Sequence, residues 1–274
     1  MPSRIIALLT DFGYRDPFVG MMKGVMLGIN PNLQLVDISH EVAPQHIREA
    51  AIVLSAAFPY FPLHTIFVVV VDPGVGGARR PIIVETADHL FVAPDNGILG
   101  PVLDQADVQC IIHATEASFF RHPISHTFHA RDVFAPLAAW LSHGARVREM
   151  GPVIDDYIRL PLPRPFVRGD GGLEGETLYQ DRFGNLMTNI SEAYLTKIWG
   201  PPPWDGVRAS LETTVICGLD AYYAQRSTQE LGMIINSWGL LEIFANGGNA
   251  MQATGAVEGS PVIIFRGQTL QQAE

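Results

Sequence analysis

The amino-acid sequence predicts an α/β domain followed by a smaller, mostly β domain. Up to about residue 158, short apolar runs alternate with helix-like segments, the pattern of a mostly parallel sheet flanked by helices. Residues 159–170 are proline-rich (LPLPRP at 160–165), cannot continue a helix or a central strand, and are typical of a linker. Over residues 171–274, short β-like runs are separated by Gly and Asn turns, which favours a β-barrel.

In the first domain, local signals predict each element. Residues 4–10 are apolar and predict a buried strand; Asp16-Pro17 then predicts a helix start, since Asp caps free amides and Pro suits the first helical position. The uninterrupted apolar run over 65–71 predicts a strand covered on both faces of its sheet. Further strands are expected at residues 33–38, 81–84, 90–93 and 108–113, and helices from 17 to about 30, at 44–57 and at 128–143 with Gly144 as its terminator.

The second domain contains no long amphipathic helical pattern. Its expected strands cover residues 174–180, 186–190, 214–216, 240–245 and 261–265.

Composition excludes several classes of function. The net charge of -10, with no basic stripe, argues against a nucleic-acid binder, because phosphate affinity needs clustered Lys and Arg. No apolar stretch is long enough to span a membrane, and the N-terminal apolar run is too short for a secretory signal. Cys110 and Cys217 lie far apart in apolar surroundings, as expected of free thiols. We therefore expect a soluble cytoplasmic protein.

Two polar stretches follow predicted strands of the first domain, where open α/β sheets tend to build their sites. Asp11, in TDFG at 10–13, could accept two hydrogen bonds from a ribose diol or merely cap a turn. In FVVVVDPGVGGARR, at residues 67–80, the glycines permit a turn that returns Arg79 toward Asp72. The alternative is an ordinary exposed ion pair, and no phosphate-loop spacing is present.

Two further stretches carry groups suited to a binding site. In TFHARD at 127–132, a neutral His129 is expected at a helix start, although His122 or His126 fits the spacing equally well. In the second domain, DRFGN at 181–185 joins NSWG at 236–239 and ANGG at 245–248; their Asn side chains, free backbone amides and an aromatic ring suit recognition of a heteroaromatic ring. Taken singly, each of these stretches is equally typical of ordinary turns without a binding function.

A metal site is the competing interpretation for the acidic residues. The candidate ligands are Asp11, Asp37, His40, Asp72, Asp95, His129 and Asp132. They come mostly from separate loops without metal-binding spacing, so we expect no metal.

The combined motifs resemble one family over nearly the whole chain. TDFG (10–13), VDPGVG (71–76), PDNG (94–97), TFHARDVFAP (127–136), DRFGNLMTNI (181–190) and NSWGLLEIFANGGNA (236–250) are similar to the S-adenosyl-L-methionine hydroxide adenosyltransferases, relatives of fluorinases and chlorinases. The resemblance implies conversion of S-adenosylmethionine and water to adenosine and L-methionine without a cofactor. It also implies a homotrimer with active sites between subunits.

The resemblance also implies roles for particular residues. Asp72, Arg79 and His129 would be catalytic, and Asp11 would hold the ribose diol. The methionine part would contact Asp16, Asp181 and Ser237, and the nucleoside would contact Phe183, Asn185, Asn246 and Gly247. Ala130, Met187 and Trp238 depart from residues usual in relatives. A halide adenosyltransferase and a non-catalytic nucleoside or S-adenosylmethionine binder are the alternatives.

Overall fold

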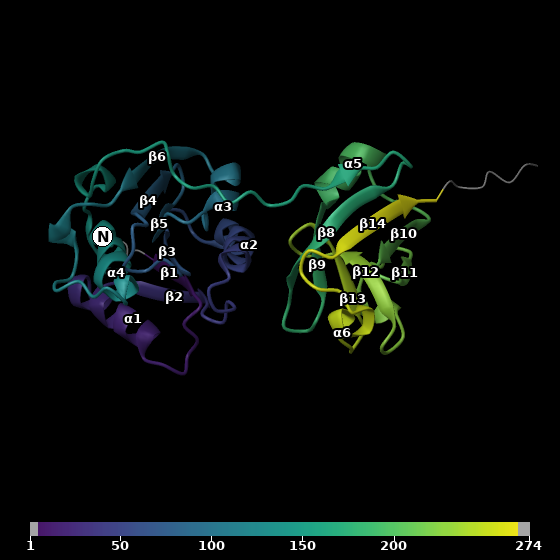
Figure 1. Ribbon diagram of the computed structural model, residues 1–274, viewed down its shortest axis with the longest axis horizontal. Coiled ribbons are helices and arrows are strands. Elements are labelled where there is room, and N and C mark those ends of the chain that lie inside the picture. Colours follow the sequence, from purple (N-terminus) through teal and green to yellow (C-terminus); the bar gives the residue numbers. More distant parts are fainter. Residues whose placement is uncertain (1–4, 268–274) are drawn as a thin grey trace, which may run out of the picture. The chain divides into compact units, whose positions relative to one another are not determined.

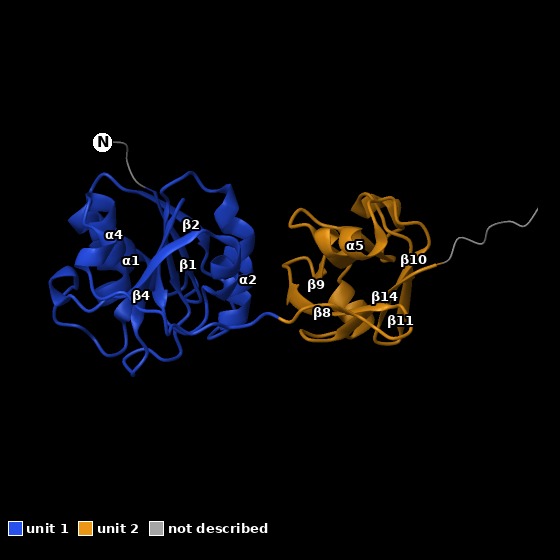
Figure 2. Ribbon diagram, turned by 90° about the horizontal axis from the view of Figure 1, so that it is seen from above, with its two compact units in different colours: residues 1–162 blue, residues 163–274 orange. Residues whose placement is uncertain are grey.

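The structure is a computed structural model that describes residues 5–267. The chain divides into two compact units, Met1–Leu162 and Pro163–Glu274 (Figure 2). The first unit has a sheet flanked by helices, and the second is built on an antiparallel sheet, so the predicted fold class is confirmed. No helix within the described residues is both long and apolar enough to cross a membrane.

A six-stranded mixed sheet forms the centre of the first unit, with the strand order β2-β1-β3-β5-β4-β6. The neighbours from β2 to β5 are parallel, whereas β4 runs antiparallel to both β5 and β6. Polar groups after β1, β2 and β3 therefore gather at one edge of the sheet. The strands are β1 (Ile5–Thr10), β2 (Gln34–Ser39), β3 (Ile66–Val70), β4 (Pro81–Thr86), β5 (Leu90–Pro94) and β6 (Val108–His113).

Helices cover both faces of this sheet (Figure 1). Because side chains alternate along a strand, Ile6 and Leu8 of β1 join one apolar cluster while Ala7 and Leu9 join the other. The first cluster packs against α1 (Phe18–Ile29) and α4 (Ala135–His143), and the second against α2 (Ile47–Ala57) and α3 (Gly100–Gln105). This double burial explains the uninterrupted apolar strands in the sequence.

Two predicted helix starts are displaced, the first from Pro17 to Phe18 and the second from Pro44 to Ile47. The carbonyl of Pro17 accepts the first helical hydrogen bond, from Met21 N at 2.9 Å, so Pro17 is the cap and Asp16 makes no capping bond. The second helix does not begin at Pro44, because Gln45 has a left-handed backbone (φ 65°) that cannot continue into a helix. Instead, His46 caps α2.

The predicted helix at 128–143 consists of two parts. Residues Ala130–Phe134 form a π-helical turn that leads into α4. The helix ends at Gly144, whose φ of 112° is the left-handed terminator predicted from the sequence. π-Turns are frequent at functional sites.

The second unit is a nearly closed, barrel-like antiparallel sheet (Figure 1). Its strand order is β11-β10-β14-β8-β9-β13-β12, and a bridge between Asp220 and Ile234 links the two ends of this order. The short β7, which pairs with β8, lies inside the predicted linker. The strands are β7 (Phe166–Val167), β8 (Leu173–Gln180), β9 (Leu186–Ser191), β10 (Val207–Leu211), β11 (Thr214–Cys217), β12 (Leu231–Ile235), β13 (Leu240–Ala245) and β14 (Pro261–Arg266).

The sequence interpretation missed β10 and β12 and the two short helices of this unit, α5 (Glu192–Trp199) and α6 (Ala250–Thr254). Both helices are capped by side chains: Ser191 accepts from Tyr194 N, and Asn249 accepts from Gln252 N. They are too short to show a convincing helical period in the sequence.

Candidate active site

Asp72 lies just beyond the carboxyl end of β3, where the buried strand gives way to a glycine-rich turn. Val75 N donates to Asp72 O at 3.2 Å, and Gly77 N donates to Gly74 O at 3.0 Å. These two successive turns reverse the chain, and Arg79 returns onto Asp72 as the glycine spacing predicted.

Arg79 joins Asp72 to His129. Its Nε donates to both Asp72 carboxylate oxygens at 2.9 Å, and its Nη2 donates to Oδ2 at 2.6 Å. The same Nη2 lies 2.7 Å from His129 Nδ1. The side chains of Asp72 and Arg79 are 5% and 9% exposed, so this is no ordinary surface ion pair. Arg80 instead pairs with Asp95 at 2.6 Å.

The contact with Arg79 determines the protonation state of His129. A guanidinium can only donate hydrogen bonds, so His129 Nδ1 must accept and the ring proton must lie on Nε2. Burial, together with the neighbouring positive charge of Arg79, lowers the pKa of His129 below its usual 6.5, although Asp72 partly opposes the effect. At neutral pH the ring is therefore neutral, and its Nε2–H is a donor.

Close backbone packing brings the two loops of this set together. Gly76 has φ 76°, and a Cβ placed on it would lie 2.1 Å from the carbonyl oxygen of His126. Only glycine fits this position, for both conformation and space. His126 contributes its backbone here, whereas the side chains of His122 and His126 do not line the pocket described next.

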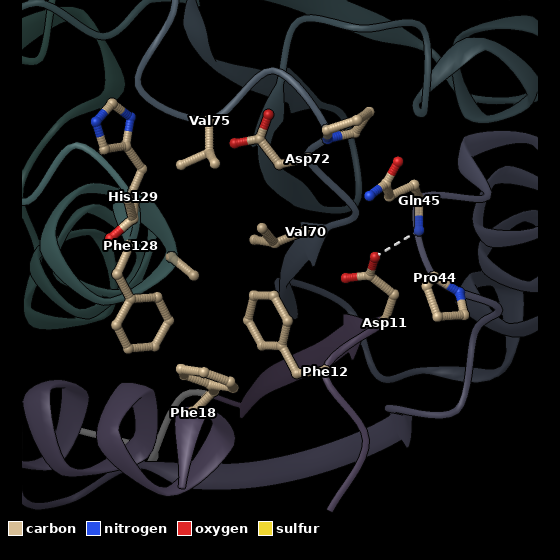
Figure 3. A pocket seen from close by; sticks show the side chains of 13 residues that line it. Asp11, Phe12, Phe18, Pro44, Gln45, Val70, Asp72, Val75, Phe128 and His129 are labelled. Carbon is tan, nitrogen blue, oxygen red and sulfur yellow. Dashed lines mark hydrogen bonds between the residues drawn. The ribbon is translucent and has the colours of Figure 1, made fainter. Parts of the chain in front are cut away.

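A pocket of about 380 Å³ lies beside these residues in the first unit (Figure 3). Figure 3 shows Asp72 and His129 at one end of it and the rings of Phe12, Phe18 and Phe128 gathered at the other. The pocket therefore has a polar end and an aromatic end. It is lined by Asp11, Phe12, Phe18, Pro44, Gln45, Val70, Asp72, Pro73, Val75, Thr127, Phe128, His129 and Ala130.

Asp11 lies on the wall of this pocket, next to Pro44 and Gln45 (Figure 3). Its Oδ2 accepts the backbone N–H of Gln45 at 2.8 Å, an amide aimed by that residue's left-handed backbone. The structure thus brings Asp11, Asp72 and His129 into the lining of one cavity, and Arg79 contacts the last two. Asp16 is exposed and is not among the lining residues of this unit's pocket.

The second unit contains its own pocket, of about 550 Å³. It is lined by Asp181, Phe183, Asn185, Tyr223, Ala245, Asn246, Gly247 and Gly248. Five of these are residues that the sequence singled out for binding: Asp181, Phe183, Asn185, Asn246 and Gly247.

Asp181 organises the hairpin that lines this pocket. Its Oδ1 accepts the backbone amides of Phe183 and Asn185, each at 2.9 Å, and its Oδ2 accepts Asn185 Nδ2 at 3.1 Å. The turn leaves Phe183 74% exposed, so its ring is available for stacking. Asn185, by contrast, is buried.

Of the other predicted residues of the second unit, Asn246 and Gly247 line the pocket and Ser237 does not. Asn246 donates its side-chain amide to Arg226 O at 2.7 Å, and Gly247 has φ 64°, so this turn presents backbone groups at the pocket. Ser237 is exposed in the turn after β12 and is not among the lining residues of this pocket.

The sequence interpretation missed Tyr223 and Glu242. Tyr223 lines the second pocket, and its hydroxyl donates to Glu242 Oε1 at 2.9 Å. Glu242 is 2% exposed, and its burial raises its pKa despite hydrogen bonds from Asn236 and Tyr223. A Glu within the apolar run of β13 was the available signal, since a buried acid needs partners.

Three of the aspartates considered as metal ligands form ion pairs with Lys or Arg side chains. Asp37 pairs with Lys23, Asp95 with Arg80 and Asp132 with Arg131. Within residues 5–267, no group of three or more His, Cys, Asp or Glu side chains is arranged to hold a metal ion.

The His129 ring should titrate below its usual pKa of 6.5, and Arg79→Met should raise that midpoint. The variant removes the neighbouring positive charge and leaves Asp72, which favours the protonated ring. NMR titration of the imidazole protons measures both midpoints, with His129→Asn identifying the resonance. An unchanged midpoint in Arg79→Met would contradict the contact that fixes the ring's protonation state.

Comparison with protein families identifies both units. Residues 6–151 match the SAM hydroxide adenosyltransferase N-terminal domain, and residues 175–263 match the C-terminal domain of the same family. A solved structure of an uncharacterized conserved protein from Thermotoga maritima is 37% identical, with a TM-score of 0.89 over 95% of this chain and 100% of that one.

Named relatives of the chain include hydrolases of S-adenosyl-L-methionine and, at lower identity, fluorinases. The (R)-S-adenosyl-L-methionine hydrolase of Salinispora tropica is 34% identical over 97% of this chain and 99% of its own. The protein of that name from Thermus thermophilus is 35% identical over 96% and 100%. The fluorinase of an Actinoplanes species is more distant, at 28% identity over 70% of this chain and 74% of its own.

Proposed function

The chain belongs to the SAM hydroxide adenosyltransferase family, and from this premise we propose that it hydrolyses S-adenosyl-L-methionine to adenosine and L-methionine. The observation that carries the proposal is the contact of Arg79 with both Asp72 and His129 at the polar end of a pocket that also contains Asp11. The names of the relatives favour the (R) sulfonium epimer as the substrate.

The reaction needs an oriented nucleophile more than acid catalysis. Water oxygen attacks the ribose C5′ in line with the bond to sulfur; the new C–O bond forms as the C–S bond breaks, and its electron pair neutralises the sulfonium. Alignment of the two reactants can supply about 7–11 kcal/mol of the barrier. The remaining difficulty is the water proton, because the pKa of bulk water is about 15.7.

We assign the uptake of this proton to Asp72. The nitrogen of His129 that could accept it, Nδ1, already faces Arg79, and Nε2 carries the ring proton. His129 can therefore donate to the water oxygen and orient it, while a carboxylate oxygen of Asp72 accepts the proton. Arg79 holds both side chains at once and stabilises the developing hydroxide charge.

The two pockets support part of the proposed substrate-binding set. Asp11 at the first pocket is suited to the ribose diol, and Phe183 and Asn185 at the second are suited to the adenine ring. Asp16, Asp181 and Ser237 are proposed for the methionine part on the family resemblance, and of these three only Asp181 lines one of the two described pockets. Asn246 and Gly247 complete the proposed nucleoside contacts.

We propose that the active form is a homotrimer in which neighbouring subunits together contact one substrate, and that it works without a cofactor in the cytoplasm. The family resemblance supports the trimer. The two cysteines, Cys110 and Cys217, are free thiols, as a reducing compartment favours.

A halide is a poorer nucleophile for this pocket. The carboxylate of Asp72 faces the position proposed for the nucleophile and would repel an anion there, whereas it can accept a proton from water. A passive nucleoside binder would need neither Asp72 nor Arg79, so their presence at the pocket favours a catalyst.

Incubation with S-adenosylmethionine in ¹⁸O-labelled water tests the function. We expect one labelled oxygen on the adenosine 5′ position, with turnover unaffected by a chelator. The two sulfonium epimers are supplied separately, and chloride and fluoride are added in parallel. A 5′-halogenated nucleoside, loss of turnover with the chelator, or tight binding without product would each overturn the proposal.

A further inference from the structure

His40 holds the loop that carries Asp11 from both sides. Its Nδ1 lies 2.7 Å from the hydroxyl of Thr10, the residue before Asp11, and its backbone oxygen accepts the N–H of Gly13 at 2.7 Å. The Thr10 hydroxyl also accepts the N–H of Phe12 at 3.2 Å. The amides of Phe12 and Gly13 are thus both held through His40, directly or through Thr10.

The tertiary fold brings these residues together across 30 positions of sequence. Thr10 ends β1 and His40 follows β2, and these strands are parallel neighbours, so their carboxyl ends lie side by side. Thr10 and His40 are both fully buried. Neither side chain can reach the substrate, so any effect on the reaction must act through the loop.

His40 is itself held in place by charged and aromatic neighbours. Its Nε2 lies 3.1 Å from Asp37 Oδ1, within ion-pair distance but without hydrogen-bond geometry. The other oxygen of Asp37 accepts Lys23 Nζ at 2.7 Å and the Tyr14 hydroxyl at 3.0 Å. The Tyr14 ring packs edge-on against His40, with ring centroids 5.1 Å apart. The negative charge of Asp37 favours the ring proton on Nε2, which leaves Nδ1 to accept the Thr10 hydroxyl.

We infer that Thr10 and His40 are positioning residues that set Asp11 for the substrate's ribose hydroxyls. The inference rests on the role of Asp11 in the proposed function. The backbone on both sides of Asp11 is fixed by the contacts with Thr10 and His40, and the Asp11 carboxylate is fixed by the Gln45 amide. A carboxylate held in this way does not have to be ordered by the substrate, so part of the cost of binding is removed.

Thr10→Val tests the inference, because it keeps the shape of the side chain and removes the hydroxyl. Loss of the two hydrogen bonds of the Thr10 hydroxyl, with His40 and from the Phe12 amide, predicts a fall in kcat/KM of about five- to twentyfold. The fall should come mainly through KM, since ribose contacts act in both the ground and transition states. In the Asp11→Ala background, the same change should alter kcat/KM by no more than about twofold. An equal fall in both backgrounds would overturn the inference.

Two further variants separate positioning from general stability. Thr10→Ser, which keeps the hydroxyl, should rescue KM. Thr65→Val removes another buried hydroxyl, which donates to Pro62 O over a distance of 2.7 Å. Thr65 does not line the pocket, so this variant should leave KM unchanged. Failure of Thr10→Ser to rescue KM, or a matching rise in KM for Thr65→Val, would count against a specific role.

Hydrogen exchange gives a readout that needs no substrate. The Phe12 amide should exchange about tenfold faster in Thr10→Val than in the wild type or Thr10→Ser. Unchanged exchange would overturn the proposed contact even if the protein hydrolyses S-adenosylmethionine. Faster exchange in a protein without hydrolase activity would instead locate the failure in the proposed function.

Discussion

Asp72→Asn is expected to lower kcat by about 10²–10⁴-fold, the usual contribution of a positioned acid or base. The amide keeps the size of the carboxylate but cannot take the water proton, and its NH₂ group would face the donors of Arg79. Affinity for adenosine should change little, because the ribose and adenine contacts are assigned to other residues. Single-turnover rates and adenosine binding by calorimetry measure the two effects.

Asp156→Asn is the matched control for this substitution. Asp156 also pairs with an arginine, Arg80 at 2.7 Å, but its side chain is 72% exposed and it does not line the pocket. Its loss should leave kcat within about twofold, as for other exposed ion pairs. Full activity in Asp72→Asn would refute Asp72 as the proton acceptor, and loss of adenosine binding would point to a structural defect instead.

Asp132→Asn is expected to destabilise the first unit by about 2–4 kcal/mol at neutral pH. The Asp132 carboxylate is fully buried and accepts Arg131 Nε at 2.7 Å, Ser125 N at 2.9 Å and Arg121 Nη1 at 3.2 Å. These bonds fix the loop and π-turn beside His129. An amide removes the charge and sets its NH₂ group against these donors. Urea denaturation measures the change.

The effect should depend on pH in a defined direction. Burial alone would raise the pKa of Asp132, but the bonds from Arg131, Ser125 and Arg121 outweigh it and hold the pKa below the usual 3.8. Its contribution is therefore fully present above pH 3.8, and the difference between wild type and Asp132→Asn should shrink as the pH falls through the lowered pKa.

An exposed pair supplies the control for stability. Asp104 pairs with Arg159 at 3.2 Å, and its side chain is 60% exposed. Asp104→Asn should change the free energy of unfolding by less than about 1 kcal/mol. Equal stability of Asp132→Asn and Asp104→Asn at neutral pH would show that the buried carboxylate does not hold the loop.

Much of the fold was readable because it is encoded locally. The apolar run over 65–71 predicted β3, and Gly144 predicted the end of α4, since burial and left-handed backbone each restrict residue choice. The helix starts near Pro17 and Pro44 were misplaced, because several neighbouring residues could each cap the helix and the sequence does not show which one does. Strands β10 (VRASL) and β12 (LGMII) were missed although each pairs with the next strand along the chain, because Ala209 and Gly232 have low β-propensity and weaken the strand pattern.

The same division holds for the candidate site. By itself, the sequence indicated that an arginine can return to Asp72, because the glycines between the two residues permit a tight turn there. Spacing alone could not choose among His122, His126 and His129, although the family resemblance implied His129, and no pattern in the sequence linked Thr10 to His40. Those contacts were decided by tertiary structure: the choice of His129 follows from a close backbone approach at Gly76, and the second contact from parallel pairing of β1 with β2. Contacts between distant segments depend on how layers pack, and packing is a property of the folded chain as a whole.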